Sequence, residues 1–133
     1  MLQYPLPPGS VVRTPGFGMG VKHLALVVSP VYMYHTNAAD LLEKCYTNVL
    51  LMAKEKGARK VSLPSLGTGG MGYPVGQASK VALTAMRKFL LKYPDSLDSV
   101  RIVCFEASVF RAFTSARQMV QGGFDAPLHS RRL

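Results

Sequence analysis

The sequence is poor in cysteine, and its two cysteines do not form a metal-binding pattern. Cys45 and Cys104 are the only ones among 133 residues, and both lie in apolar surroundings. Their separation matches no ligand spacing of a structural metal site. No leader with a basic start and an apolar middle opens the chain. We therefore expect no metal, and a reducing compartment, the cytosol or the nucleus.

Long hydrophobic runs are also missing. The longest, from Leu24 to Tyr34, is interrupted by Pro30 and is much shorter than the roughly 20 apolar residues that a membrane-spanning helix needs. This predicts a soluble protein that does not insert into a membrane.

Acidic residues are scarce. Seven Asp and Glu stand against sixteen Lys and Arg, which gives a net charge of +9. Such a charge favours anionic partners, although it is equally typical of a small protein kept soluble by its charge. The cationic residues that cluster are Lys54, Lys56, Arg59 and Lys60, together with Arg131 and Arg132 near the end of the chain.

Strand-like and helix-like segments alternate along a chain of single-domain length. Residues 1–9 are a proline-rich, irregular lead-in, and residues 122–133 a loose basic tail. The run 23–28 is almost continuously apolar, as in a strand buried on both faces of a parallel sheet. This order predicts an α/β layered fold with parallel pairing and right-handed crossovers. The expected strands are 10–14, 23–28, 60–66 and 100–105, and the expected helices are 38–56, 75–93 and 108–120.

Apolar spacing indicates which helix faces are buried. In 38–56 the apolar residues recur on one face, Asn37 or Asp40 can cap the start, and Gly57 can end it. The helix 75–93 shows the same pattern. For 108–120 the expected inward residues are Val109, Phe110, Phe113 and Val120.

A glycine-rich loop, PSLGTGGMGYPVG, fills residues 64–76 between a strand and a helix. In α/β folds such a turn can present backbone N–H groups to an anion, aided by the helix dipole. Tyr73 and Pro74 follow Gly72 where a P-loop would have Lys and Ser or Thr, and the dinucleotide GxGxxG spacing is absent. The composition therefore indicates an anion-binding loop, with an ordinary flexible turn as the alternative.

The segment SLPSLGTGGMGYP, preceded by LLEKCYTNVLLMAKEKGARKV and followed by a helix and VRIVCF, resembles a known family. It is similar to the C-terminal two-thirds of a macrodomain, the module that binds ADP-ribose and in some members hydrolyses its derivatives. The similarity runs from about Pro8 to Phe113. It implies a three-layer α/β/α fold with a mostly parallel sheet, truncated at its N-terminus.

The resemblance implies a set of ligand-binding residues. Residues of the loop would wrap the diphosphate and the distal ribose. Phe105 would lie against the adenine, or else pack in the core, and Tyr73 would pack beneath the loop. Residues 28–30 would border the ribose, or simply end their strand. The individual positions are Gly67, Thr68, Gly69, Gly70, Met71, Gly72, Val28, Ser29, Pro30 and Phe105.

Several family features are missing. The family's first two strands and helix, its Asn-Ala-Ala-Asn stretch and a second glycine-rich loop have no counterpart before Pro8. Leu26, Ser29 and Met71 stand where the family usually has His, Gly and an aromatic residue. The stretch Asn37–Asp40 looks like the Asn-rich motif, but a helix N-terminus explains it better.

No catalytic residue is predicted. Cys45 lies on the apolar face of a helix and is expected to be an inert, buried thiol. Glu106 is as well explained by capping the last helix. The leading hypothesis is therefore a non-catalytic module, without a cofactor, that binds ADP-ribose or a related nucleotide diphosphate through the glycine-rich loop 67–72. Its expected partner is ADP-ribose or an ADP-ribosylated protein.

Two alternatives stay open. One is a basic nucleic-acid-binding module, with RNA as the partner, or a protein-interaction module that has lost the pocket. The other is an ADP-ribosyl hydrolase completed by another chain. Loss of the N-terminal strands would also leave 23–28 or 61–66 as a sheet edge, which predicts a homodimer through that edge or a covering by the lead-in.

Overall fold

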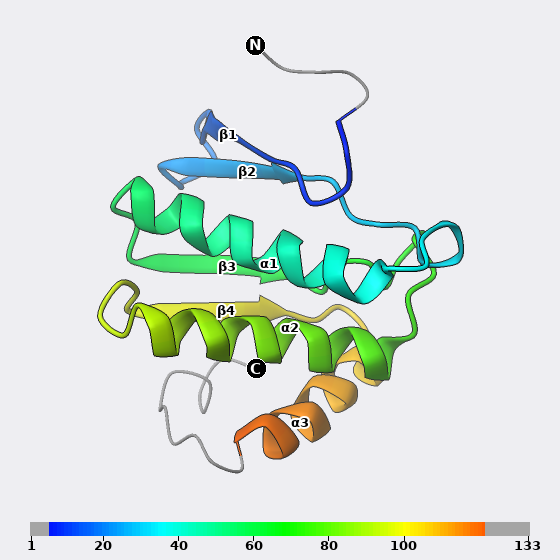
Figure 1. The fold of residues 1–133 in the computed structure, drawn as a ribbon. Coiled ribbons are helices and arrows are strands. Elements are labelled where there is room, and N and C mark those ends of the chain that lie inside the picture. The colour runs from blue at the N-terminus through cyan, green and yellow to red at the C-terminus, as the bar shows by residue number, and fades with distance from the viewer. Residues whose placement is uncertain (1–5, 122–133) are drawn as a thin grey trace.

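The computed structural model describes residues 6–121 and shows the predicted alternation of strands and helices (Figure 1). Every predicted element is confirmed to within two residues at each end. A short 3₁₀ helix, η1, was not predicted. The tail 122–133 and the first part of the lead-in lie outside the described residues. The elements are β1 (Val11–Pro15), β2 (His23–Val27), η1 (Tyr32–Tyr34), α1 (Ala38–Glu55), β3 (Lys60–Pro64), α2 (Val75–Lys92), β4 (Ser99–Val103) and α3 (Ala107–Gln121).

The first two strands form an antiparallel pair. The expectation that 23–28 would be a parallel strand buried on both faces was therefore wrong, and Leu26 is 54% exposed. The connection at 16–22 explains the pairing, because a parallel pair needs a crossover of a dozen or more residues.

The other two strands, β3 and β4, pair in parallel through the α2 crossover, as predicted. The side chains of Leu63, Val100 and Ile102 are buried on the helix side of this pair. On the opposite face Ser62 and Arg101 are exposed. The α/β class is confirmed, and in the described chain that second face of β3–β4 is open.

The core lies between the strands and the inward faces of α1 and α2. Leu42, Tyr46 and Leu50 of α1 have no exposed surface, and Phe113 of α3 is equally buried. Gly57 follows the C-cap residue of α1 and terminates the helix, as predicted, with a φ of 72°. Asn37 is at the N-cap, but its side chain makes no capping hydrogen bond. None of the described helices is long and apolar enough to cross a membrane.

One inward-facing prediction for α3 was wrong. Phe110 is 47% exposed, whereas Val109, Phe113 and Ala116 are buried. These three recur at intervals of four and three residues and define the inward stripe, and Phe110 lies about 100° around the helix from Val109. The side chain of Val120 lies outside what the structure describes.

Candidate functional site

The glycine-rich loop lies where β3 ends, at the same edge of the sheet as the end of β4, because the two strands are parallel. Its base is held by side chains. The N–H of Leu66 donates to Oη of Tyr46 at 2.8 Å. Oγ1 of Thr68 donates to the carbonyl of Ser65 at 3.2 Å and lies 3.0 Å from the Ser65 Oγ. The first residues of the loop are therefore held in place by hydrogen bonds, unlike those of a flexible turn.

Two of the loop glycines need their conformational freedom. Gly67 has φ 81° and Gly72 has φ 74°, a region that side chains with a Cβ rarely adopt. A Cβ on Gly67 would also lie 3.3 Å from Cδ1 of Leu42. The carbonyl of Gly67 accepts from the N–H of Tyr73 at 2.9 Å, which closes the loop on itself.

The top of the loop is open. A Cβ built on Gly69 or Gly70 would meet no atom within 4 Å. The N–H groups of Gly69, Gly70 and Met71 donate to no other group within residues 6–121. Three successive donors are thus free for a ligand that carries acceptor oxygens.

The helix that follows adds positive potential at the same place. α2 begins at Val75, directly after the loop, and its first turn contains no acidic residue. The first N–H groups of a helix have no partner within the helix, and the macrodipole places a partial positive charge there. Loop and helix together favour an anion.

The segment after β2, which contains Pro30 and Tyr32, contacts the glycine-rich loop. The N–H of Tyr32 donates to the carbonyl of Met71 at 3.0 Å, and the rings of Tyr32 and Tyr73 lie 4.8 Å apart between centroids. Pro30 is fully buried, and Tyr73 is 4% exposed. Tyr73 therefore packs beneath the loop, as predicted.

Main-chain hydrogen bonds hold residues 28–30 in place near the glycine-rich loop. The carbonyl of Val28 accepts from the N–H of Gly9 at 2.8 Å and from Sγ of Cys45 at 3.3 Å. Val28 and Ser29 keep partly exposed surface. The structure thus brings the predicted ligand-binding stretches, 28–30 and 67–72, close together beyond the carboxyl ends of β2 and β3.

Phe105 lies two residues beyond the end of β4, at the same edge. Its side chain is 89% exposed. Packing in the core, the alternative explanation for this residue, therefore does not apply. An aromatic ring this exposed can stack on a flat ligand.

Two titratable side chains of α1, Cys45 and Tyr46, are fully buried near the site. Burial raises the pKa of the Cys45 thiol and, more strongly, the pKa of the Tyr46 hydroxyl. Both groups also make hydrogen bonds to the main chain. Cys45 has the packing of an inert thiol, as predicted. No group of three or more His, Cys, Asp or Glu that could hold a metal occurs in the described part of the chain.

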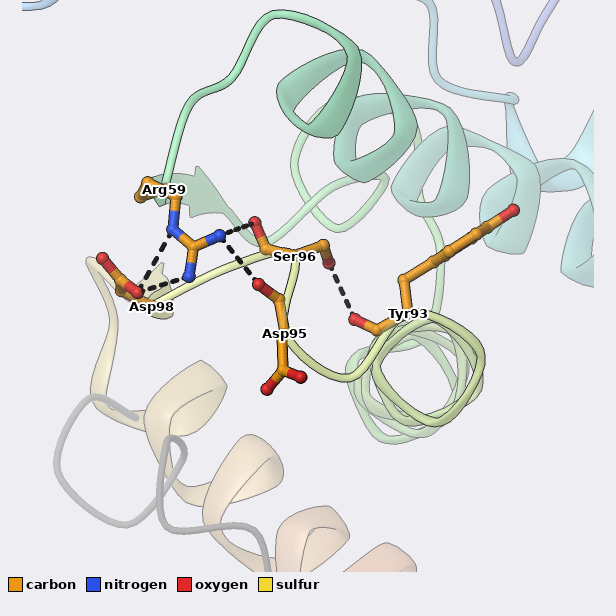
Figure 2. A network of polar contacts seen from close by, with 5 residues as sticks. All are labelled: Arg59, Tyr93, Asp95, Ser96 and Asp98. Carbon is orange, nitrogen blue, oxygen red and sulfur yellow. Dashed lines mark hydrogen bonds and ion pairs between the residues drawn. The ribbon is translucent and has the colours of Figure 1, made fainter.

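The basic segment 54–60 lies at the opposite end of the sheet from the loop, before β3 begins (Figure 1). Figure 2 shows Arg59 bound by several groups. Its Nε and Nη2 donate to Oδ1 of Asp98 at 3.2 and 2.8 Å, and Nη1 donates to the carbonyls of Asp95 and Ser96 at 2.7 and 3.1 Å. Arg59 thus ties the start of β3 to the turn before β4.

The other cations proposed for nucleic-acid binding are placed differently. Nζ of Lys54 lies 4.7 Å from the ring centroid of Tyr93. Lys56 and Lys60 are exposed. Arg131 and Arg132 lie outside the described residues. Of the four cations that can be assessed, two already have contacts within the protein.

The Arg59–Asp98 pair gives a pH-dependent prediction. The guanidinium of Arg59 lowers the pKa of Asp98. The stabilisation from this pair is therefore fully present above the ordinary aspartate pKa of about 3.9, and it is lost as the pH falls through the lower pKa of Asp98 in the folded state. Asp98→Asn should lower the melting temperature slightly at pH 7, and this difference should disappear in strong acid. The pair is half-exposed, so its effect is small.

Thermal unfolding followed by circular dichroism between pH 7 and pH 2 measures this difference. Asp95→Asn is the matched control, because Asp95 holds Arg59 through its main-chain carbonyl. A gap for Asp98→Asn that stayed constant into strong acid would contradict the assignment.

Comparison with known proteins agrees with this geometry. The family model "Macro domain" matches residues 1–82. A macro domain-containing protein of Streptomyces nogalater is 32% identical over 108 residues, which are 81% of this chain and 58% of that protein. The O-acetyl-ADP-ribose deacetylase of Salmonella typhimurium is 33% identical over 118 residues, which are 88% of this chain and 64% of that protein.

Solved structures with a similar fold are also macrodomains. The Oceanobacillus iheyensis macrodomain with ADP superposes with a TM-score of 0.82 at 28% identity, over 87% of this chain and 60% of that one. A Trypanosoma brucei macrodomain in complex with ADP-ribose gives 0.76 at 28% identity, over 83% and 46%. The chain spans less than two-thirds of the length of these relatives. By its sequence and its fold, the chain belongs to the macrodomain family.

Proposed function

We propose that this chain is a binding module for ADP-ribose or a related nucleotide diphosphate, held through residues 67–72. The observation that carries the proposal is the row of free N–H donors on Gly69, Gly70 and Met71, beside the start of α2. The Oceanobacillus iheyensis and Trypanosoma brucei macrodomains, solved with ADP and ADP-ribose, support this ligand class.

In the proposed complex, each part of the site meets a different part of the ligand. The diphosphate accepts from the loop N–H groups, and the absence of a Cβ on Gly69 and Gly70 lets it approach the main chain. Residues 28–30 border the ribose next to the loop. Phe105 stacks on the base, and because stacking reads a flat surface rather than a hydrogen-bonding pattern, discrimination among bases should be poor.

We further propose that the module on its own is not catalytic. In the described chain the thiol of Cys45 and the hydroxyl of Tyr46 are buried and engaged in hydrogen bonds, so neither is free to act on a ligand. Glu106 is exposed beside Phe105 and directly precedes α3. We assign it a capping role at the start of that helix rather than a catalytic one.

Isothermal titration calorimetry tests the binding proposal. ADP-ribose, ADP and GDP should all bind, whereas adenosine, which lacks the diphosphate, should not. Equal heats for adenosine and ADP, or no heat with any of the diphosphates, would contradict the role of the loop. Acetate release from O-acetyl-ADP-ribose, the reaction named for the Salmonella typhimurium relative, tests the second proposal, and turnover by the purified chain would refute it.

Phe105 gives a prediction for the base-binding end. Phe105→Ala should weaken ADP-ribose binding by about 10-fold, because base–aromatic stacking contributes about 1–3 kcal/mol. The melting temperature should not change, since the ring is almost fully exposed.

Phe17→Ala is the matched control for this variant. Phe17 is 76% exposed and lies in the β1–β2 connection, away from the loop. Its removal should leave the affinity unchanged. An equal loss in both variants, or none in Phe105→Ala, would remove Phe105 from the site.

A further inference from the structure

The connection between β1 and β2 carries three exposed apolar side chains. Residues 16–22 read GFGMGVK, and we call them the hairpin tip. Phe17, Met19 and Val21 are 76%, 66% and 52% exposed. Gly18 and Gly20 separate them, and a Cβ built on either glycine would meet no atom within 4 Å. The three side chains therefore project into solvent and belong to no core cluster of the described chain.

The main chain of the hairpin tip is strained at Phe17. The N–H of Met19 donates to the carbonyl of Gly16 at 3.0 Å, which closes a four-residue turn. Its central residues, Phe17 and Gly18, have φ 49° and 80°, and positive φ at both positions is typical of a type I′ turn. Asn, Asp or Gly usually occupies the first position, because larger side chains are strained there. An aromatic ring held in solvent by a strained residue indicates a role outside the fold.

The charge around the hairpin tip is positive. Residues 6–39 contain no Asp or Glu. Lys22 is exposed at the end of the tip. Arg13 is exposed on β1, and its Nε donates to Nδ1 of His23 at 2.9 Å. The apolar side chains are therefore flanked only by cations within this part of the chain.

The basic segment 54–60 lies at the same end of the molecule as the hairpin tip. β2 and β3 point the same way in Figure 1, the tip directly precedes β2, and the basic segment leads into β3. The acidic residues of this end are outnumbered, and one of them, Asp98, is paired with Arg59. The acids are Glu55, Asp95 and Asp98, and the cations are Lys22, Lys54, Lys56, Arg59, Lys60 and Lys92.

We propose that the hairpin tip is a docking site for an anionic membrane surface. Phe17, Met19 and Val21 enter the headgroup region, where apolar side chains leave water. The surrounding lysines are attracted to the negative lipids. The glycine-rich loop lies at the opposite end of the strands (Figure 1), so a docked protein keeps the proposed ligand site facing away from the lipid.

This contact differs from insertion of a spanning segment. The expectation that the chain does not insert rests on the shortness of its apolar runs, which applies to helices that cross the bilayer. None of the helices in residues 6–121 could do so. The hairpin tip reaches only the interface, where a few apolar side chains with flanking cations are sufficient for reversible binding.

The size and shape of the hairpin tip favour a membrane over a macromolecular partner. A stable protein interface buries about 800 Å² on each partner, which is more than three side chains on a narrow turn provide. RNA bases stack on flat rings, and of the three side chains only that of Phe17 has one. Lipid needs neither a large matched area nor a flat ring, since it closes around any apolar side chain.

Co-sedimentation of the full chain with vesicles tests the proposal. The chain should bind vesicles of phosphatidylcholine mixed with phosphatidylserine, and at least about tenfold more weakly to phosphatidylcholine alone. The sequence contains no tryptophan, so Phe17→Trp places a single indole at the tip. Its fluorescence should shift to the blue on addition of the mixed vesicles, as the ring leaves water. The measurement needs no nucleotide and is independent of the function proposed above.

Phe17→Asn separates docking from folding. Asparagine tolerates positive φ, so the melting temperature should not fall, while binding to the mixed vesicles should weaken at least about tenfold. Met33→Asn is the matched control, because Met33 is also strongly exposed but lies in η1, beyond the other end of β2. It should leave vesicle binding unchanged.

Four outcomes would overturn the proposal. The first is no binding to the mixed vesicles, and the second is binding without a blue shift of the Phe17→Trp fluorescence, which would place the contact elsewhere. The third is an equal loss in Phe17→Asn and Met33→Asn, or no loss in either. The fourth is self-association or RNA binding that depends on Phe17 while vesicles are not bound.

Discussion

Gly69→Val should weaken ADP-ribose binding by at least about 100-fold, which corresponds to about 2.7 kcal/mol. The valine side chain would occupy the open space above the loop, where we place the diphosphate. Hydrogen bonds to a charged group contribute about 1.5–3 kcal/mol each, so displacing the ligand from even two of the three free donors accounts for this loss.

The fold itself should tolerate this change. A Cβ on Gly69 meets no atom within 4 Å, and Gly69 does not have the positive φ of Gly67 and Gly72. The melting temperature should therefore stay within a few degrees of the wild-type value. This separates Gly69→Val from changes at Gly67 or Gly72, which would strain the main chain and so confuse affinity with stability.

Calorimetric titration and thermal unfolding of the same samples measure the two effects. Ser115→Val, an exposed position on α3, adds a similar side chain far along the helix from Phe105 and should leave binding unchanged. A Gly69→Val protein that still bound ADP-ribose with wild-type affinity would exclude the loop as the diphosphate site.

Leu42→Ala should lower the free energy of unfolding by about 2–5 kcal/mol, the range for removing a buried leucine side chain. Leu42 has no exposed surface. A Cβ on Gly67 would lie 3.3 Å from its Cδ1, so this side chain supports the glycine-rich loop from below. The cavity should therefore loosen the loop as well as the core.

Urea unfolding and calorimetric titration below the unfolding transition measure this prediction. Leu41→Ala is the matched control, because Leu41 is the preceding residue of α1 and only partly buried. It should cost clearly less stability and leave the affinity unchanged. If Leu42→Ala lost stability but bound ADP-ribose as well as the wild type, the core would not position the loop.

Local patterns in the sequence were sufficient to predict the elements and the loop. The burial of α1 and α2 follows the apolar repeat of a helix, which depends only on neighbours three or four residues apart. The termination of α1 before Gly57 and the positive φ of Gly72 follow from the conformational freedom of glycine. The placement of Tyr73 beneath the loop was predicted from the resemblance to macrodomains.

The exposed or paired state of single side chains could not be predicted in this way. Phe105 and Phe110 are both aromatic, yet their exposure depends on which other elements cover them. Arg59 looks like a free cation in a basic run, and only the turn at 95–98 shows that its guanidinium is engaged (Figure 2).

By itself, the sequence determined the order of helices and strands, the buried helix faces and the glycine-rich loop, because each depends on residues close together in the chain. Only the tertiary structure decided how the first two strands pair. It made β1–β2 antiparallel. Strand pairing joins residues far apart in the chain, so it depends on where α1 and the short β1–β2 connection place them, and an apolar run such as 23–28 does not record its partner.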